Sequence, residues 1–213
     1  MKLNVIDAGK KFGKTWIFHN VSMVFEPGKI YGFAGKNGSG KTMLMKCILG
    51  LVPLSEGRID LDGKVIGTDI EMLPSVGAIV ETPGFLPNLS GFDNLKYLAS
   101  LRGIISDQQI VSTMERLGLQ PTERKHVGKY SLGMCQRLGL AQALMEEPEI
   151  LILDEPFNAL DSDCANDVCE ILKEQRASGR CVILSSHNRN DIDALCDDVF
   201  EFHDGAVMHE SRE

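Results

Sequence analysis

The sequence lacks an apolar run of the length that a membrane-spanning helix needs, which is about 20 residues. Runs such as EILIL (149–153) have the length of a buried strand. The N-terminal segment MKLNVIDAGKKFGK also lacks the apolar core of a secretory signal. With 213 residues, the chain is long enough for one domain with a substantial core. We therefore expect a single soluble domain located in the cytoplasm.

Paired cysteine spacings are missing as well. None of the six cysteines falls in a CxxC or CxxxH pattern, and each lies in an apolar or helical stretch. Reduced thiols that pack as small hydrophobic groups are the expected role, which disfavours a structural metal or a redox centre. The sequence also contains no internal repeats and no low-complexity segments.

The last third of the chain is short of positive charge. Residues 1–145 carry 17 basic and 12 acidic side chains, whereas residues 146–213 carry 5 basic and 18 acidic ones. An acidic surface repels phosphate backbones, so nucleic acid is not an expected partner. A solvated face on the last helices explains the same charges without any partner.

What the chain does contain is an alternation of strand and helix patterns at both ends. Two strand patterns open the chain, and a third (29–35) runs into a glycine-rich loop that precedes a helix pattern over 42–52. A further apolar strand, 76–81, is expected to end on Glu81. Because strands and helices alternate again towards the C-terminus, we predict an α/β fold with a doubly wound, mostly parallel sheet.

The middle of the chain has helical patterns only, which is typical of an insertion into such a sheet. We expect one domain over 1–213. Residues 1–81 and 148–213 form its α/β core with a β subdomain, and residues from about 84 to 147 form a helical subdomain.

A phosphate-binding loop is predicted between the third strand and the first helix. The stretch GKNGSGKT matches G-x-x-x-x-G-K-[ST] in the strand–loop–helix context that this motif requires. Its glycines let successive backbone N–H groups point at phosphate oxygens, Lys41 supplies a charge, and Thr42 offers a hydroxyl to Mg²⁺. The expected nucleotide contacts are Gly35, Lys36, Asn37, Gly38, Ser39, Gly40, Lys41 and Thr42.

The stretch ILILDE (150–155) supplies the complementary carboxylates. An aliphatic strand brings Asp154 and Glu155 to its C-terminal end, where α/β sheets bind ligands. Asp154 is predicted to hold Mg²⁺ through water, and Glu155 to act as the base that orients and deprotonates a water molecule. The alternative is that Glu155 only caps the loop that follows.

These motifs and three later ones together resemble the ATP-binding subunits of ABC transporters. KYSLGMCQRLGLAQAL (129–144) resembles the signature segment of that family, NALD (158–161) the loop after the second motif, and ILSSH (183–187) the strand with the switch histidine. The resemblance implies a P-loop NTPase (RecA-like) fold with an N-terminal antiparallel β subdomain and an inserted α-helical subdomain. It also implies ATP and Mg²⁺ as ligands, and ATP hydrolysis as the activity.

The resemblance assigns roles to individual residues. Ser131 and Gly133 contact the phosphate of the ATP that a second subunit binds, so two copies, or two related protomers, close around two nucleotides. His187 contacts the γ-phosphate and holds the attacking water. Asp161 reaches across the dimer interface or, alternatively, caps the following helix. Phe12 stacks on adenine or, alternatively, packs on an edge strand.

Glu81 occupies a position where most such ATPases have glutamine. Its carboxylate is a suitable ligand for Mg²⁺, and we expect it to line the nucleotide site. A glutamate here, with its flanking residues, resembles the bacitracin-resistance and lantibiotic-immunity subgroup, which exports antimicrobial peptides. The alternative is a neutral variant in a transporter of another cargo. Members of this subgroup often extend well past the switch histidine, and we expect no such extension here because the sequence given ends 26 residues after His187.

The resemblance therefore predicts a cytoplasmic ATPase subunit that is peripheral on the inner face of the cell membrane. Separate membrane-spanning subunits would receive its movement through the loop 81–91 and the helical subdomain. Phe85, Leu86 and Leu89 form an apolar docking spot for them or, alternatively, pack inward. The competing function is a regulatory ATPase of the ABC type that acts on a soluble partner.

Overall fold

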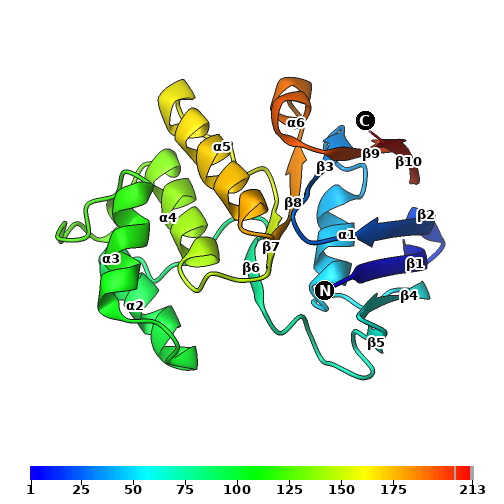
Figure 1. Cartoon of the computed structure of the whole chain (residues 1–213), viewed down its shortest axis with the longest axis horizontal. Coiled ribbons are helices and arrows are strands. Elements are labelled where there is room, and N and C mark those ends of the chain that lie inside the picture. The colour runs from blue at the N-terminus through cyan, green and yellow to red at the C-terminus, as the bar shows by residue number, and fades with distance from the viewer. Residues whose placement is uncertain (204, 212–213) are drawn as a thin grey trace.

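The computed structural model describes residues 1–203 and 205–211 and contains two β-sheets. The smaller sheet is antiparallel, with the strand order β2-β1-β4-β5. Its turn at Asp62 and Gly63 has positive φ at both residues, which matches the right-handed twist of a hairpin. Figure 1 shows this sheet at the right of the molecule. Its strands are β1 (Leu3–Phe12), β2 (Thr15–Phe25), β4 (Glu56–Leu61) and β5 (Lys64–Val65).

The larger sheet has six strands in the order β10-β9-β3-β8-β7-β6, and every neighbouring pair except β10 with β9 is parallel. Every residue of β7 and β8 is buried, because helices or the smaller sheet cover both faces of these central strands. The strands are β3 (Ile30–Gly35), β6 (Val76–Ile79), β7 (Ile150–Leu153), β8 (Cys181–Ser186), β9 (Asp198–His203) and β10 (Ala206–Ser211).

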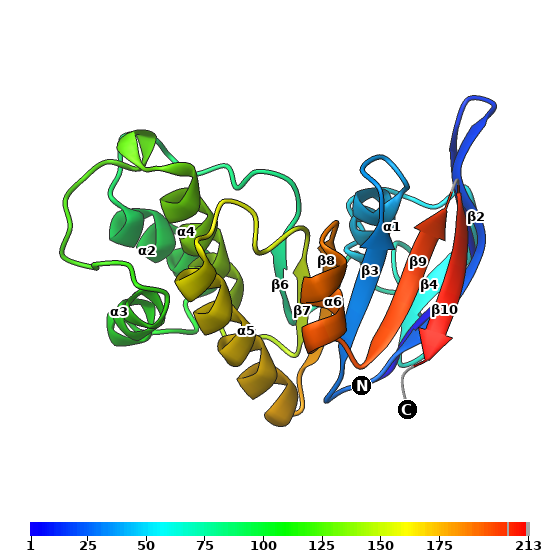
Figure 2. The ribbon, with the colours of Figure 1, turned by 90° about the horizontal axis from the view of Figure 1, so that it is seen from above.

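The helices form two groups, which Figure 2 separates. Three helices pack on the inner strands β3 and β8, and the others gather beyond β6, at the end opposite the antiparallel sheet, where one of them also contacts β6. Within the described ranges, no helix is long and apolar enough to cross a membrane. The first group is α1 (Lys41–Ile48), α5 (Ser162–Ala177) and α6 (Arg189–Leu195); the second is α2 (Gly91–Arg102), α3 (Asp107–Arg116), the short η1 (Val127–Lys129) and α4 (Leu132–Leu144).

The predicted α/β fold class is confirmed, but two predicted element ends are wrong. The helix α1 ends at Ile48, since Gly50 adopts a left-handed φ of 81° and turns the chain before Pro53. The strand β6 ends at Ile79, because its partner β7 ends opposite at Leu153. Glu81 thus lies two residues beyond the strand.

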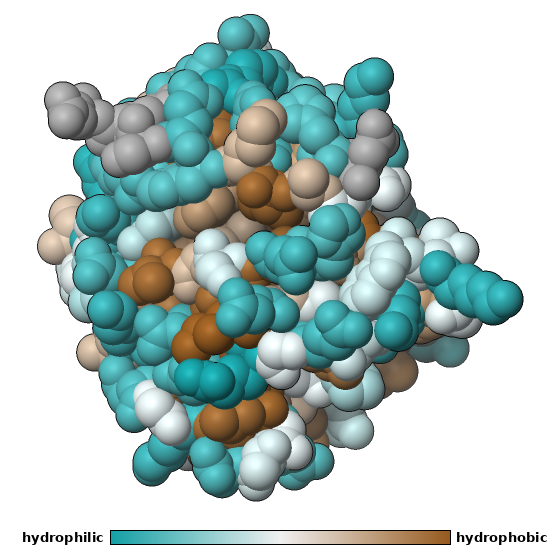
Figure 3. Space-filling model, turned by 90° about the vertical axis from the view of Figure 1, so that its right-hand side faces the viewer, coloured by the Kyte–Doolittle hydropathy of each residue, from teal (hydrophilic) through white to brown (hydrophobic). Residues whose placement is uncertain are grey.

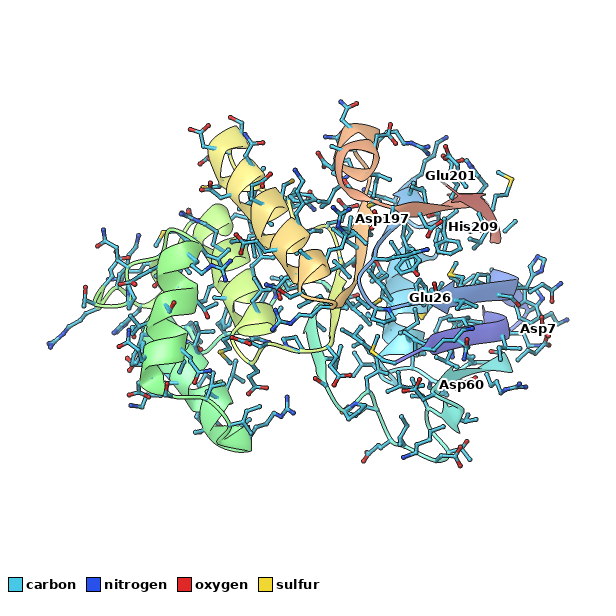
Figure 4. All side chains as sticks on the ribbon, viewed as in Figure 1. Asp7, Glu26, Asp60, Asp197, Glu201 and His209 are labelled. Atoms are coloured by element: carbon cyan, nitrogen blue, oxygen red, sulfur yellow. The ribbon has the colours of Figure 1, made fainter. Side chains whose placement is uncertain are left out.

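A half-buried carboxylate fixes the start of β3, the strand that leads into the glycine-rich loop. Asp197, labelled in Figure 4, accepts hydrogen bonds from the backbone N–H of Ile30 and from Nη1 of Arg176 on α5, both at 2.8 Å. The strand is therefore attached at its N-terminal end to both β9 and α5, which gives the loop at its other end a rigid support.

The surface at the end of the molecule with the antiparallel sheet and β9–β10 is mixed in character. Figure 3 shows hydrophilic residues around scattered hydrophobic ones. Val24 and Met208 are among the exposed apolar side chains of these strands. The apolar side chains that matter for stability lie instead in two buried clusters, one on each face of the larger sheet.

Candidate functional site

The glycine-rich loop joins β3 to α1 and turns back over the start of the helix. Gly35, Gly38 and Gly40 all have positive φ, at 141°, 80° and 108°, which only glycine adopts readily. The ammonium of Lys41 donates to the carbonyls of Gly35 at 2.7 Å and Lys36 at 3.0 Å, so it lies inside the curl of the loop. Burial lowers the pKa of Lys41, while the carboxylates of Glu155 and Asp154 oppose this shift. The loop is therefore shaped around one buried cation.

Two hydroxyl groups hold the carboxylate of Asp154. Thr42 Oγ1 donates to Oδ2 at 2.7 Å, and Ser185 Oγ donates to Oδ1 at 2.6 Å. The Ser185 hydroxyl also accepts from the backbone N–H of Glu155 at 2.9 Å. The structure thus joins the predicted metal residues Thr42 and Asp154 across the ends of α1 and β7. The sequence analysis missed Ser185, whose role depends on the pairing of β7 with β8.

Glu155 and His187 meet at the C-terminal ends of β7 and β8. His187 Nδ1 lies 2.8 Å from Glu155 Oε2, and the backbone N–H of His187 donates to the same oxygen at 3.4 Å. The other carboxylate oxygen, Oε1, is buried and has no hydrogen-bond partner. Glu155 also has a positive φ of 51°. One oxygen is therefore held by the histidine, and the second is free to accept a proton.

Glu81 forms an ion pair in the wall of the same site. Its Oε1 lies 2.6 Å from Nζ of Lys46, in the last turn of α1. Glu81 itself adopts a left-handed φ of 63°. The sequence analysis did not single out Lys46, because nothing local predicts that the loop after β6 meets this helix.

These residues surround a cavity of about 410 Å³ beside the glycine-rich loop. Phe12 does not line the cavity. It lies near the tip of the β1–β2 hairpin with 55% of its surface exposed, and the ammonium of Lys10 lies 4.9 Å from the centre of its ring. The cavity wall is formed by Ile17, Asn37, Gly38, Ser39, Gly40, Lys41, Thr42, Met43, Lys46, Glu81, Asp154 and Glu155.

Ser131 is the N-cap of α4 and does not line this cavity. Its Oγ accepts from the backbone N–H of Met134 at 3.2 Å, which leaves its O–H free to donate outward. A Cβ atom on Gly133 would lie 2.6 Å from the carbonyl oxygen of Ala159, so glycine is required here by close packing on the loop after β7. The exposed Leu132 lies between them.

Gln136, one turn further along α4, links that helix to the backbone of Glu155. Its Nε2 donates to the backbone carbonyls of Glu155 at 3.2 Å and Pro156 at 3.1 Å. The sequence analysis quoted this residue within the signature segment but gave it no role. Its geometry makes it a support of the turn that carries Glu155.

Asp161 caps a helix in this structure. Its Oδ1 accepts from the backbone N–H of Cys164 at 2.9 Å, at the start of α5. This hydrogen bond lowers the pKa of Asp161. The capping alternative therefore holds in the single chain, and the second oxygen is left for other contacts.

Phe85 and Leu86, which were expected to act together, are separated. Phe85 packs against the core, whereas Leu86 is 47% exposed. Buried Asn94 fixes the backbone of Leu86 by donating to its carbonyl at 3.1 Å and accepting from its N–H at 2.8 Å. Leu89 is half-buried at the end of this loop.

The residues of the cavity fit a nucleotide with its metal ion. Ser39 Oγ and Glu155 Oε1 are buried polar atoms without a partner, and both adjoin the glycine-rich loop. Among the residues described, no cluster of three or more His, Cys, Asp or Glu side chains is arranged to hold a metal. Mg²⁺ is commonly held by one or two carboxylates together with phosphate oxygens, so Thr42 and Asp154 suit a metal that arrives with a nucleotide.

Known proteins of one family resemble this chain in sequence. The sequence profile of the ABC transporter family matches residues 18–158. The chain is 42% identical to the "uncharacterized ABC transporter ATP-binding protein YybJ" of Bacillus subtilis (strain 168), over 96% of this chain and 94% of that protein. It is 41% identical to the "bacitracin transport ATP-binding protein BcrA" of Enterococcus faecalis, over 94% of this chain and 66% of that protein. The "lantibiotic transport ATP-binding protein SrtF" of Streptococcus pyogenes is 34% identical, with coverages of 99% and 90%.

Solved structures share the fold. An ATP-binding subunit of an ABC transporter superposes with a TM-score of 0.90 at 25% identity, covering 99% of this chain and 90% of that one. A dimeric bacterial ABC transporter cassette gives 0.87 at 22% identity, covering 99% of both chains. The chain therefore belongs to the ABC transporter family, as an ATP-binding subunit with ATPase activity.

Proposed function

We propose that this subunit powers the export of antimicrobial peptides of the bacitracin or lantibiotic type. The similarity to the bacitracin and lantibiotic transport proteins supports the cargo class. The observation that supports ATP hydrolysis as the energy source is the Glu155–His187 pair. It lies at the edge of the cavity beside the glycine-rich loop, and one oxygen of its carboxylate has no hydrogen-bond partner.

The chain's own residues suffice for the binding step. Backbone N–H groups of the loop from Gly35 to Thr42 and the positive end of α1 receive the phosphates, and the Lys41 ammonium exchanges its carbonyl partners for phosphate oxygens. Thr42 and Asp154, with Glu81 nearby, would hold Mg²⁺, which would neutralise phosphate charge. Ile17 lies in the cavity wall, and exposed Phe12 is available to stack on the base.

The hydrolytic step uses the remaining carboxylate. Glu155 Oε1 accepts a proton from the attacking water, while His187 holds Oε2 and the geometry of the pair. The Thr42 hydroxyl donates to Asp154 in this structure, so it would have to turn in order to act as a metal ligand. Gln136 keeps the turn that carries Glu155 in place.

The proposed partners are a second ATPase subunit, identical or closely related, and separate membrane-spanning subunits that hold the chain at the inner face of the cell membrane. The position of Ser131 outside the cavity of its own chain supports a second subunit, whose nucleotide this residue would contact. Leu86, Tyr97 and Leu101 are exposed apolar side chains on the helical part and suit a membrane-subunit contact.

The test is a deletion strain of the source organism, assayed for growth inhibition by bacitracin and by a lantibiotic. We expect the deletion to increase sensitivity to at least one of these peptides and the wild-type gene to restore growth. A gene encoding Glu155→Gln should fail to restore it although the protein is produced at the same level. Unchanged sensitivity to peptides of both classes would contradict the proposed cargo.

A further inference from the structure

The ion pair between Lys46 and Glu81 has no role in the function described so far. It joins two segments that are distant in sequence: the end of the helix that starts at the phosphate loop, and the loop that follows β6. The side chain of Lys46 is 22% exposed and that of Glu81 is 64% exposed, and both line the nucleotide cavity. The pair is therefore open to competition from whatever enters this cavity.

The helix side of this pair is rigid. In α1, Leu44, Met45, Cys47 and Ile48 are buried against the core, so the Lys46 backbone is firmly positioned relative to the phosphate loop. On the loop side, the contact with Lys46 helps to fix the backbone of Glu81. Glu81 has a left-handed φ of 63°, a conformation that a non-glycine residue keeps only when its surroundings favour it.

The carboxylate of Glu81 faces two kinds of positive charge. One is the ammonium of Lys46, at 2.6 Å in this structure. The other is the metal ion proposed for Thr42 and Asp154, which line the same cavity. A carboxylate is a good ligand for Mg²⁺, whereas the glutamine usual in this family would have no charge with which to hold a lysine.

We propose that Lys46 is a positioning residue that holds Glu81 away from the metal in the nucleotide-free subunit, and that Mg²⁺–nucleotide binding transfers Glu81 from Lys46 to the metal. The transfer releases the loop 81–90 from α1. That loop leads directly into α2, to which Asn94 fastens it, so its release is passed to the helical part. The inference rests on the proposed Mg²⁺ site and not on the proposed cargo.

The test measures the dissociation constant of a fluorescent ATP analogue in Mg²⁺ and in EDTA, for the full chain and its variants. The readout is the ratio of the two constants. Loss of the Lys46 charge itself weakens phosphate attraction under both conditions and therefore largely cancels from this ratio. Replacing Lys46 by methionine removes the competitor for Glu81, so we expect the preference for Mg²⁺ to rise about two- to fivefold, as expected for a partly exposed ion pair.

Three comparisons sharpen this test. Lys46→Arg restores the charge and should give the wild-type ratio. In a Glu81→Gln background, Lys46→Met should leave the ratio unchanged. The matched control Lys173→Met breaks the Lys173–Glu170 pair on α5, at 2.8 Å and outside the cavity, and should have no effect.

Amide hydrogen exchange of residues 80–90 supplies a second readout. Mg²⁺–nucleotide should accelerate exchange there in the wild type, and Lys46→Met should raise exchange without nucleotide. A Mg²⁺ preference that falls in Lys46→Met means that Lys46 and the metal share Glu81, which overturns the proposal. The proposal is also overturned if the ratio of the dissociation constants in Mg²⁺ and EDTA is the same in Lys46→Met as in the wild type. Equal wild-type affinity in Mg²⁺ and EDTA overturns the metal site and this inference together, while leaving the peptide-sensitivity test unaffected.

Discussion

At the scale of single residues, three non-glycine residues with a left-handed backbone lie beyond the C-terminal ends of β6 and β7. Glu81, Glu155 and Ala159 are non-glycine residues with positive φ, at 63°, 51° and 61°. Such conformations cost about 1–3 kcal/mol each and persist where the surroundings fix them. Here the fixing contacts are Lys46 on Glu81, Ser185 and Gln136 on Glu155, and close-packed Gly133 on Ala159. The strain places two carboxylates beside the phosphate loop.

The Glu155→Gln substitution tests the assignment of the base. An amide keeps the size of the side chain but cannot accept the proton, so we expect ATP turnover to fall by about 10²–10⁴. The affinity for ATP should stay within about twofold, because Lys41 and the loop are untouched. Phosphate release and calorimetry measure the two quantities. Glu170→Gln, a change on the exposed face of α5, is the control; turnover by Glu155→Gln equal to this control would refute the assignment.

The site residues that the sequence could predict are those whose expected role is indicated by a local sequence motif. Lys41 and Thr42 belong to one loop motif, and Asp154 directly follows one aliphatic strand. The pattern does not show Ser185, Lys46 or Gln136, because each acts on a residue that lies far away in sequence. Phe12 is a residue that the sequence could locate but not place in space. Its position upstream of the loop predicts a contact with the base, whereas the geometry of the hairpin puts its ring outside the cavity wall.

At the scale of elements, the contact of α4 with β6 joins the helical part to the sheet. A Cβ atom on Gly77 of β6 would lie 1.9 Å from the carbonyl oxygen of Ala143 near the end of α4. A backbone carbonyl cannot move aside without moving the helix. Glycine at position 77 therefore allows α4 to pack closely against β6. This packing positions Ser131 and Gln136, which lie on the same helix.

Gly77→Ala should consequently lower the free energy of unfolding by about 1–3 kcal/mol, as overpacking of a filled site does. Urea denaturation followed by circular dichroism measures the change. The control is Gly84→Ala in the loop after β6, where a Cβ atom meets nothing within 4 Å and the change should stay within about 0.5 kcal/mol. Equal stability of the two variants would mean that α4 is not fixed at this point.

The order and type of the main elements followed from periodicity, whereas their ends depended on tertiary partners. The caps of α2 and α3 are local contacts, because Ser90 and Ser106 each accept from a backbone N–H three residues later. The end of β6 is not set locally, since it depends on where β7 stops pairing. The mistake mattered for function: an extended Glu81 would not have the left-handed turn that places its side chain beside Lys46.

At the scale of the whole molecule, the core on one face of the larger sheet raises the pKa of two buried thiols. Burial raises the pKa of Cys47 from 9.0 to about 11 and that of Cys181 from 9.0 to about 12. Between pH 9 and these values the unfolded chain has lost thiol protons that the folded chain retains. The free energy of unfolding must therefore fall as the pH rises through this window.

At pH 10 each of these thiols should lower the free energy of unfolding by about 1.4 kcal/mol relative to pH 8. Cys181→Ala removes one titrating group. Between pH 8 and pH 10 the free energy of unfolding of this variant should therefore fall by about 1.4 kcal/mol less than that of the wild type. Urea titrations at the two pH values measure it. Identical pH dependence of the variant and the wild type would show that Cys181 ionises as freely in the folded chain as in the unfolded one.

The position of Ser131 bears on whether two copies of the chain assemble around nucleotide. Ser131 caps α4 with its oxygen and keeps its O–H for an outside acceptor, away from the cavity of its own chain. In Glu155→Gln with ATP, light scattering on a sizing column should detect a dimer. Adding Ser131→Thr should preserve it, because threonine caps and donates. Adding Ser131→Asp keeps a good cap but brings a negative charge towards phosphate, so dimerisation should weaken by about tenfold or more. If the aspartate variant dimerises as well as the threonine variant, Ser131 only caps its helix, and the second copy does not complete the site through this residue.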